Sequence, residues 1–217
     1  MESGTAAKRA IDAGTFAEAF RITAANRENE IFVRTKGDDV ALTWREVRER
    51  VDALAGGLAK LGLARGQSMA ILLTNRPEFH IADLAAMMLD ATPFSIYPTY
   101  TPEQIQYLIS DSAARVAILE QAFLDRMLEA RKELPGLEHV IVVDGDAPDG
   151  VTPLADVEGS NPDFDVDASR RAIKPDHLLT LIYTSGTTGP PKGVELSHAN
   201  MMSVIQSIEE IIGLPEA

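Results

Sequence analysis

The feature that most restricts the fold of this chain is a regular alternation between short apolar runs and longer segments with helical periodicity. The apolar runs lie at residues 68–73, 92–97, 115–120 and 139–144. The helical patterns lie at residues 43–63, 77–91, 101–112 and 121–134. Short apolar runs separated by helices are typical of parallel strands buried on both faces. We therefore predict an α/β fold, a mostly parallel sheet with helices on both faces.

Three of the predicted helices have recognisable start signals. Thr43 and Glu46 have the spacing of a capping box, in which each residue satisfies a backbone N–H of the other. Thr101 is a suitable N-cap, and Pro102 after it suits the first helical position. Pro77 marks the start of the helix that follows the first buried strand.

The segment at residues 144–176 departs from this alternation. It is rich in Asp, Pro and Gly, a composition that favours turns and loops. The sequence predicts an acidic, solvent-exposed connector with at most one short helix. We expect residues 1–176 to form one α/β subdomain that ends in this loop. Residues 177–217 are then expected to begin a second unit as a strand, a turn, a strand and a helix.

Charge and composition exclude several classes of function. The chain has 33 acidic and 20 basic residues, a net charge of −13. Such a chain is a poor ligand for nucleic acids or anionic membranes, both of which attract basic surfaces. The sequence has no Cys, which rules out disulfides and thiolate metal sites. We expect a cytoplasmic protein without a membrane span, because no apolar run approaches the roughly 18 residues of a spanning helix.

A glycine-rich stretch, YTSGTTGPPKGV at residues 183–194, lies between an apolar run and a helical pattern. Its candidate phosphate-binding residues are Thr184, Ser185, Gly186, Thr187, Thr188, Gly189 and Lys192. Glycines let backbone N–H groups surround an anion, and a lysine adds a point charge suited to phosphate. The stretch is not a Walker loop, because Pro191 precedes the lysine and Gly193 follows it. From composition alone, a phosphate loop and a plain turn both remain open.

The pattern of this stretch resembles the phosphate-loop signature of the adenylate-forming superfamily, which contains acyl-CoA synthetases, luciferases and peptide-synthetase adenylation domains. The similarity extends upstream to LTWREV at residues 42–47 and to the long segment at residues 75–112. It continues downstream through KGVELSHANMM at residues 192–202. Within the superfamily, residues 96–112 are most similar to bacterial long-chain fatty acyl-CoA synthetases.

The resemblance implies an AMP-forming ligase that converts a fatty acid, ATP and CoA to acyl-CoA through an acyl-adenylate, with Mg²⁺ on the phosphates. The loop residues named above would hold the nucleotide. The family's metal-associated Glu, ribose-binding Asp and C-terminal domain with its catalytic Lys have no counterpart in this sequence. We therefore expect an N-terminal part of such an enzyme, with no catalytic or metal residue of its own and no activity alone. An enzyme that passes its acyl group to a carrier protein, and a non-catalytic nucleotide-binding or assembly module, are the alternatives.

The remaining candidates are weaker. His80 lies within a predicted helix and is best explained by packing. His198 stands at a predicted helix start, where it either shapes the helix entry or approaches the phosphate loop. His139 and His177 begin strand-like runs and have no partner in the sequence.

The last predicted helix is apolar around much of its circumference, which favours self-association through this surface. The residues of this apolar surface are Met201, Met202, Val204, Ile205, Ile208, Ile211 and Ile212.

Overall fold

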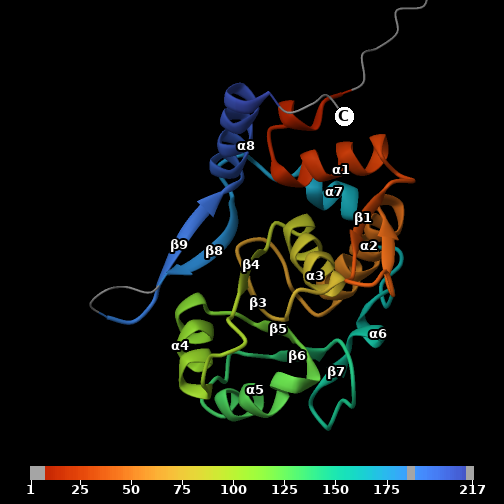
Figure 1. The fold of residues 1–217 in the computed structure, drawn as a ribbon. Helices are drawn as coiled ribbons and strands as arrows, with labels where there is room; N and C mark the ends of the chain where they lie inside the picture. Colours follow the sequence, from red (N-terminus) through yellow and green to blue (C-terminus); the bar gives the residue numbers. More distant parts are fainter. Residues whose placement is uncertain (1–7, 185–188, 214–217) are drawn as a thin grey trace, which may run out of the picture.

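The alternation of strands and helices predicted from the sequence is present in the computed structural model, which describes residues 8–184 and 189–213. Figure 1 shows how these elements follow one another along the chain. In chain order they are β3 (Ser68–Leu72), α3 (Pro77–Met88), β4 (Thr92–Ser95), α4 (Pro102–Ser112), β5 (Val116–Leu119), α5 (Leu124–Arg131) and β6 (His139–Val142). A short 3-10 helix, η2 (Gln121–Phe123), leads into α5.

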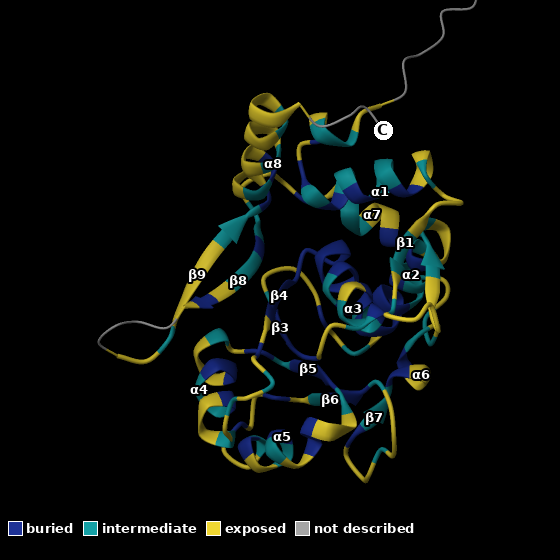
Figure 2. Cartoon of the chain, viewed as in Figure 1, coloured by how far each residue is buried: buried dark blue, intermediate teal, exposed yellow. Residues whose placement is uncertain are grey.

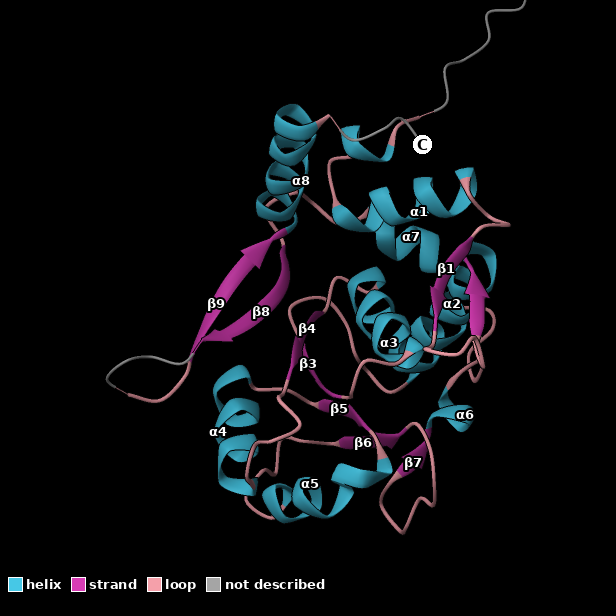
Figure 3. Ribbon diagram, viewed as in Figure 1, coloured by secondary structure: helices cyan, strands magenta, loops and turns pink. Residues whose placement is uncertain are grey.

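The predicted parallel sheet is confirmed. Within the described residues it has the strand order β7-β6-β5-β3-β4-β8-β9. In this sheet, the strands from β3 to β8 pair in parallel with their neighbours. Among its described strands, only β8 (Leu178–Thr184) and β9 (Lys192–Ser197) form an antiparallel pair. Figure 3 shows this pair as a hairpin that extends from the sheet. Since Leu181 of β8 pairs with Phe94 of β4, β8 and β9 share the sheet of the preceding part.

Helices cover both faces of the sheet, as predicted. Met69 and Ile71 of β3 belong to one core cluster, whereas Ala70 and Leu72 belong to the other. The first cluster lies beneath α1 (Phe16–Asn26), α2 (Trp44–Lys60) and α3, and the second beneath α4 and α5. Figure 2 shows the central strands β3 and β5 and much of α3 as buried, whereas β9 is largely exposed. Full burial of one such aliphatic side chain stabilises the fold by about 1.5–3 kcal/mol.

The predicted helix starts are also confirmed. Thr43 and Glu46 form a complete capping box at α2, and Pro77 is the first residue of α3. Thr101 caps α4, where Pro102 is the first helical residue. A capping residue of this kind contributes about 1 kcal/mol. The boundaries therefore follow from local hydrogen bonding as well as from the apolar pattern.

The segment at residues 144–176 is more ordered than its composition suggested. It contains β7 (Thr152–Pro153), α6 (Leu154–Val157) and α7 (Val166–Arg171), two short helices rather than at most one. Its apolar residues Leu154, Val157 and Val166 are buried in the first core cluster. The backbone of this segment packs directly against α2. A Cβ added at Gly57 would lie only 2.0 Å from the carbonyl oxygen of Val157. The segment thus contains, among its acidic residues, apolar side chains that pack in the core next to α2.

An outer layer is built from both ends of the described chain. The short helix η1 (Ala10–Asp12) and α1 lie beside α8 (His198–Ile212), as Figure 1 shows. Gln206 of α8 donates a hydrogen bond of 3.0 Å to the carbonyl of Ile11, and Arg9 pairs with Glu209. A separate hairpin of β1 (Ile31–Arg34) and β2 (Ala41–Thr43) leads into α2. Among residues 8–184 and 189–213, no helix combines the length and apolar character needed to cross a bilayer.

Candidate functional site

The glycine-rich stretch connects the two strands of the β8–β9 hairpin. Thr184 is the last residue of β8 and pairs with Lys192, the first residue of β9. These two residues therefore flank the loop at residues 185–191. Thr184, Gly189 and Lys192 are all exposed to solvent. Of the predicted site residues, Ser185, Gly186, Thr187 and Thr188 lie outside the described residues. The structure therefore brings together Thr184 and Lys192, whose side chains stand on neighbouring strands.

The stem of the loop is fixed by a buried tyrosine. The hydroxyl of Tyr183 donates a hydrogen bond of 2.8 Å to Asp111 Oδ2, and its oxygen lies 3.4 Å from the carbonyl oxygen of Leu108. Burial, together with the Asp111 carboxylate, raises the pKa of Tyr183, so the hydroxyl stays protonated and keeps its donor. Opposite it, Gly193 leaves room for the ring, because a Cβ there would lie 3.2 Å from Tyr183 Cζ. A larger residue at position 193 would displace the ring.

The exit of the loop is tied to the same helix. Tyr107 of α4 donates a hydrogen bond of 3.0 Å from its hydroxyl to the carbonyl of Pro191. On the other side of the hairpin, the hydroxyl of Thr180 donates to the carbonyl of Pro93 at 2.8 Å. The hairpin is thus attached to α4 and to β4 on both of its sides. Such an attachment fixes the two strands from which a surface loop extends.

A cluster of charged residues lies at the start of β8. His177 Nδ1 is 2.7 Å from Asp90 Oδ2, and His177 Nε2 is 2.8 Å from a guanidinium nitrogen of Arg65. Arg65 Nε also lies 3.4 Å from Asp90 Oδ2. Burial raises the pKa of Asp90, whereas the nearby His177 and Arg65 act in the opposite direction. These three residues contribute to a cavity of about 410 Å³ along the hairpin stem, whose lining does not include Thr184 or Lys192.

His198 is a structural residue. It is the first residue of α8, it is 1% exposed, and its Nδ1 accepts a 3.2 Å hydrogen bond from the backbone N–H of Phe16. Burial lowers the pKa of His198 to about 4, so the ring is neutral and can accept this bond. Ser197 and Asn200 form a capping box around it. Of the two roles that the sequence left open, the structure supports the one at the helix entry.

The other histidines have different surroundings. His80 lies on α3 with much of its surface exposed, its ring stands edge-on to Phe32 and Phe79, and partial desolvation lowers its pKa. His139 begins β6 and pairs with Val116 in the sheet. Within residues 8–184 and 189–213, no three histidine or acidic side chains are arranged to hold a metal ion.

Sequence reasoning missed the contacts that hold the loop in place. The roles of Asp111, Tyr107 and Asp90 could not be predicted, because each is distant in sequence from the residue that it contacts. The sequence contained one indication of the Tyr183 packing. Tyr183 pairs across the hairpin with Gly193, the glycine that follows the lysine. The resulting arrangement presents a cation and a hydroxyl at the ends of a glycine-rich loop, which suits a polyanion.

Comparisons with known proteins agree with this description. Residues 20–216 match the family model described as AMP-binding enzyme. "Long-chain-fatty-acid--CoA ligase FadD15" of Mycobacterium tuberculosis is 31% identical over 166 residues, which are 76% of this chain and 28% of that protein. "Uncharacterized protein Rv1549" of the same organism is 37% identical over 134 residues, 62% of this chain and 75% of that protein.

Solved structures show the same fold. The inhibitor-bound N-terminal domain of FACL13 from Mycobacterium tuberculosis superimposes with a TM-score of 0.80 at 23% identity. The match covers 93% of this chain and 49% of that chain. The chain thus spans less than a third of FadD15 and about half of the FACL13 domain. On the family match over residues 20–216, the chain belongs to the AMP-binding enzyme family.

Proposed function

We propose that this chain holds the phosphates of ATP in an AMP-forming ligase that joins a long-chain fatty acid to CoA. The observation that carries this proposal is the pairing of Thr184 with Lys192 at the two ends of a loop rich in glycine and threonine. The bonds from Tyr183 to Asp111 and from Tyr107 to Pro191 give that loop a fixed base. A fixed base reduces the ordering cost when a ligand binds.

In this reaction the loop has to supply positive charge and to position the phosphates. A carboxylate oxygen of the fatty acid attacks the α-phosphorus of ATP, the bond from that phosphorus to its bridging oxygen breaks, and pyrophosphate leaves. The Lys192 ammonium would neutralise the charge that develops on pyrophosphate, and the Thr184 hydroxyl would donate to a phosphate oxygen. In the second step the CoA sulfur bonds to the acyl carbon and AMP leaves. Nothing in the described residues acts on that step.

Mg²⁺ and CoA remain predictions. The described residues contain no group of three acidic or histidine side chains placed for a metal. Mg²⁺ commonly binds through substrate phosphates with one or two carboxylates, so we expect it to arrive with ATP. No step is assigned to it. The prediction that CoA is a substrate is supported by relatives such as FadD15, which is named as a CoA ligase.

The proposed substrate class rests on relatives and on residues 96–112. FadD15 is named as a long-chain fatty acid ligase and is 31% identical to this chain. A second candidate is an aromatic acid, because "4-coumarate--CoA ligase 3" of Oryza sativa subsp. japonica is 34% identical over 77% of this chain. In a ligase that contains this chain, palmitate should support ATP–pyrophosphate exchange better than coumarate, acetate or an amino acid. A preference for coumarate or an amino acid would reject the fatty acid assignment.

Calorimetric titration of the 217-residue chain with ATP, pyrophosphate and AMP tests the phosphate-binding proposal. If the loop holds the β- and γ-phosphates, ATP and pyrophosphate should bind and compete. AMP should bind at least about tenfold more weakly, since it lacks the charge-assisted bonds to those phosphates. Equal affinity for AMP and ATP would contradict the assignment. We also expect no palmitoyl-CoA from palmitate, ATP and CoA with this chain alone, and detection of that product would overturn the expectation of inactivity.

A further inference from the structure

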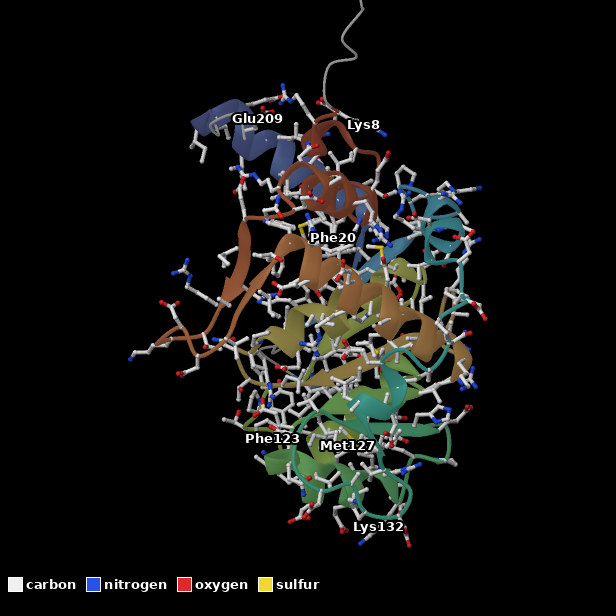
Figure 4. The ribbon with its side chains drawn as sticks, turned by 90° about the vertical axis from the view of Figure 1, so that its right-hand side faces the viewer. Lys8, Phe20, Phe123, Met127, Lys132 and Glu209 are labelled. Carbon is white, nitrogen blue, oxygen red and sulfur yellow. The ribbon has the colours of Figure 1, made fainter. Side chains whose placement is uncertain are left out.

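A second cavity lies in the outer layer, away from the glycine-rich loop. It has a volume of about 500 Å³ and is enclosed by η1, α1, α3 and α8. Figure 4 labels Lys8, Phe20 and Glu209, which belong to its wall. Small-molecule sites have volumes of about 300–1,000 Å³ and are mainly apolar with a few polar groups. The cavity therefore has the size and the character of a ligand site.

The inner wall of this cavity is aromatic. Phe16 and Phe20 come from α1, Phe32 from β1 and Trp44 from the start of α2. The ring centroids of Phe32 and Trp44 are 4.6 Å apart with nearly perpendicular planes, and those of Phe20 and Trp44 are 6.1 Å apart. Several rings around one space can present their negative faces to a cation, and this geometry recognises organic ammonium groups.

A carboxyl group without a partner lies in the same wall. Asp83 of α3 makes no hydrogen bond or ion pair with any residue in the described parts of the chain. Asp83 is partly buried, and this partial loss of hydration raises the pKa of its carboxyl group to about 7. A carboxyl group that is partly shielded from water and has no protein donor is unfavourable in an apolar wall, although it stays accessible from the cavity. A ligand that supplies a cationic donor would remove this cost.

The other charged groups of the wall have partners or are neutral. Lys8 pairs with Glu18, and Arg9 pairs with Glu209. Arg27 lies 3.7 Å from Glu30. Burial lowers the pKa of His80, which favours its neutral ring. Asp83 is thus the group that sets the charge preference of the interior.

We propose that this cavity binds a small organic cation, an aliphatic amine or quaternary ammonium, with its charged nitrogen between Asp83 and the aromatic rings and its alkyl part against α8. A fatty carboxylate would place a second negative charge beside Asp83. An alcohol would fill the same space but would gain neither the Coulomb attraction nor the interaction with the ring faces. The proposal is independent of the phosphate-loop function.

Trp44 makes the test direct, because it is the only tryptophan of the chain and it lines the cavity. Its fluorescence is followed during titration with three probes of equal alkyl length, hexyltrimethylammonium, hexanol and hexanoate. The ammonium should bind about tenfold or more tightly than the other two, the value of one charge-assisted contact. Equal or tighter binding of hexanol or hexanoate, or no response to any probe, would overturn the proposal.

Two substitutions sharpen the result. Asp83→Asn keeps the shape of the side chain and should weaken hexyltrimethylammonium binding by about tenfold or more, with little effect on hexanol. Asp149→Asn makes the same change of charge at an exposed loop residue and should leave all affinities unchanged. Unchanged ammonium binding in Asp83→Asn would reject the role of the carboxylate. The three-probe comparison uses the unaltered chain, so it decides the question even if a variant does not fold.

Discussion

The hydroxyl of Tyr183 and the carboxylate of Asp111 form a 2.8 Å hydrogen bond that joins the last turn of α4 to the strand entering the glycine-rich loop. The bond is partly buried, and the Tyr183 side chain packs against Phe94, with ring centroids 5.5 Å apart. Because Asp111 belongs to a helix of the α/β core, the position of the loop stem depends on the core and not on the loop itself.

Tyr183→Phe should separate this bond from the packing of the ring. The substitution leaves the Asp111 carboxylate without its donor, which we expect to reduce the free energy of unfolding by about 1–3 kcal/mol. Urea denaturation measures the change, and Tyr97→Phe serves as control because Tyr97 is 62% exposed. ATP affinity should fall in Tyr183→Phe as well. Equal stability of the two variants would show that the bond does not hold the stem.

At position 90, substitution by glycine should destabilise the fold less than substitution by alanine. The φ angle of Asp90 is 59°, in the left-handed region, while its carboxylate meets His177 and Arg65. Both Asp90→Gly and Asp90→Ala lose these contacts, but only alanine bears the cost of about 1–2 kcal/mol for a Cβ in this conformation. Thermal or urea unfolding should therefore rank wild type, then Gly, then Ala. A more stable alanine variant would contradict this account of the turn.

His198 should make the fold less stable as pH falls. Its pKa is lowered from 6.5 to about 4 in the folded chain, so between these values the unfolded chain binds a proton that the folded chain does not. Stability is then lost from about pH 6.5 down to about pH 4, by at most about 3 kcal/mol. His198→Asn can still accept from the Phe16 N–H but cannot titrate. Relative to wild type, this variant should gain stability as pH falls, measured by urea unfolding across the window.

Asp83 should act in the opposite direction. Its pKa is raised from 3.8 to about 7, so the folded chain retains a proton that the unfolded chain releases. Stability is therefore lost as pH rises between these values. Asp83→Asn should gain stability relative to wild type as pH rises, with Asp149→Asn as the control. Parallel pH profiles for Asp83→Asn and wild type would contradict the perturbed carboxyl group.

The outer face of α8 is expected to mediate self-association. Val204, Ile208, Ile211 and Ile212 are 55%, 43%, 81% and 65% exposed and follow helical spacing, whereas Met202 is only 3% exposed. An exposed apolar face of this kind favours association. Light scattering at high concentration should show dimers or larger species, and the double substitution Val204→Glu with Ile208→Glu should reduce them. Ser203→Glu, a neighbouring exposed position, should not, and a monomeric wild type would refute the expectation.

The sequence predicted what depends on local pattern. Capping at Thr43 and Thr101 and the buried strands from residue 68 to residue 142 are determined by nearby residues, and all are present. The order of residues 144–176 was not predicted, because Leu154, Val157 and Val166 are spaced among many acidic residues and show no clear period. Their burial depends on close contact with Gly56 and Gly57 of α2, a long-range relationship.

The candidate site shows the same division. Thr184 and Lys192 were predicted from the motif, and their pairing across the hairpin follows from its register. The partners of Tyr183 and His177 could not be predicted, since Asp111 and Asp90 are separated from them by 72 and 87 residues. The position of the Asp83 carboxyl in a cavity wall could likewise not be predicted, because α3 is apolar and buried on most sides.

The central claim is that Lys192 and its loop bind the polyphosphate of ATP. Calorimetric titration of the wild-type chain and of Lys192→Ala with ATP tests it most directly, with Lys132→Ala at the exposed end of α5 as the control for loss of charge. Removal of one charge-assisted contact should weaken ATP binding by about ten- to a hundredfold in Lys192→Ala. Lys132→Ala should bind ATP as the wild type does. ATP binding by Lys192→Ala with wild-type affinity would contradict the phosphate-loop assignment.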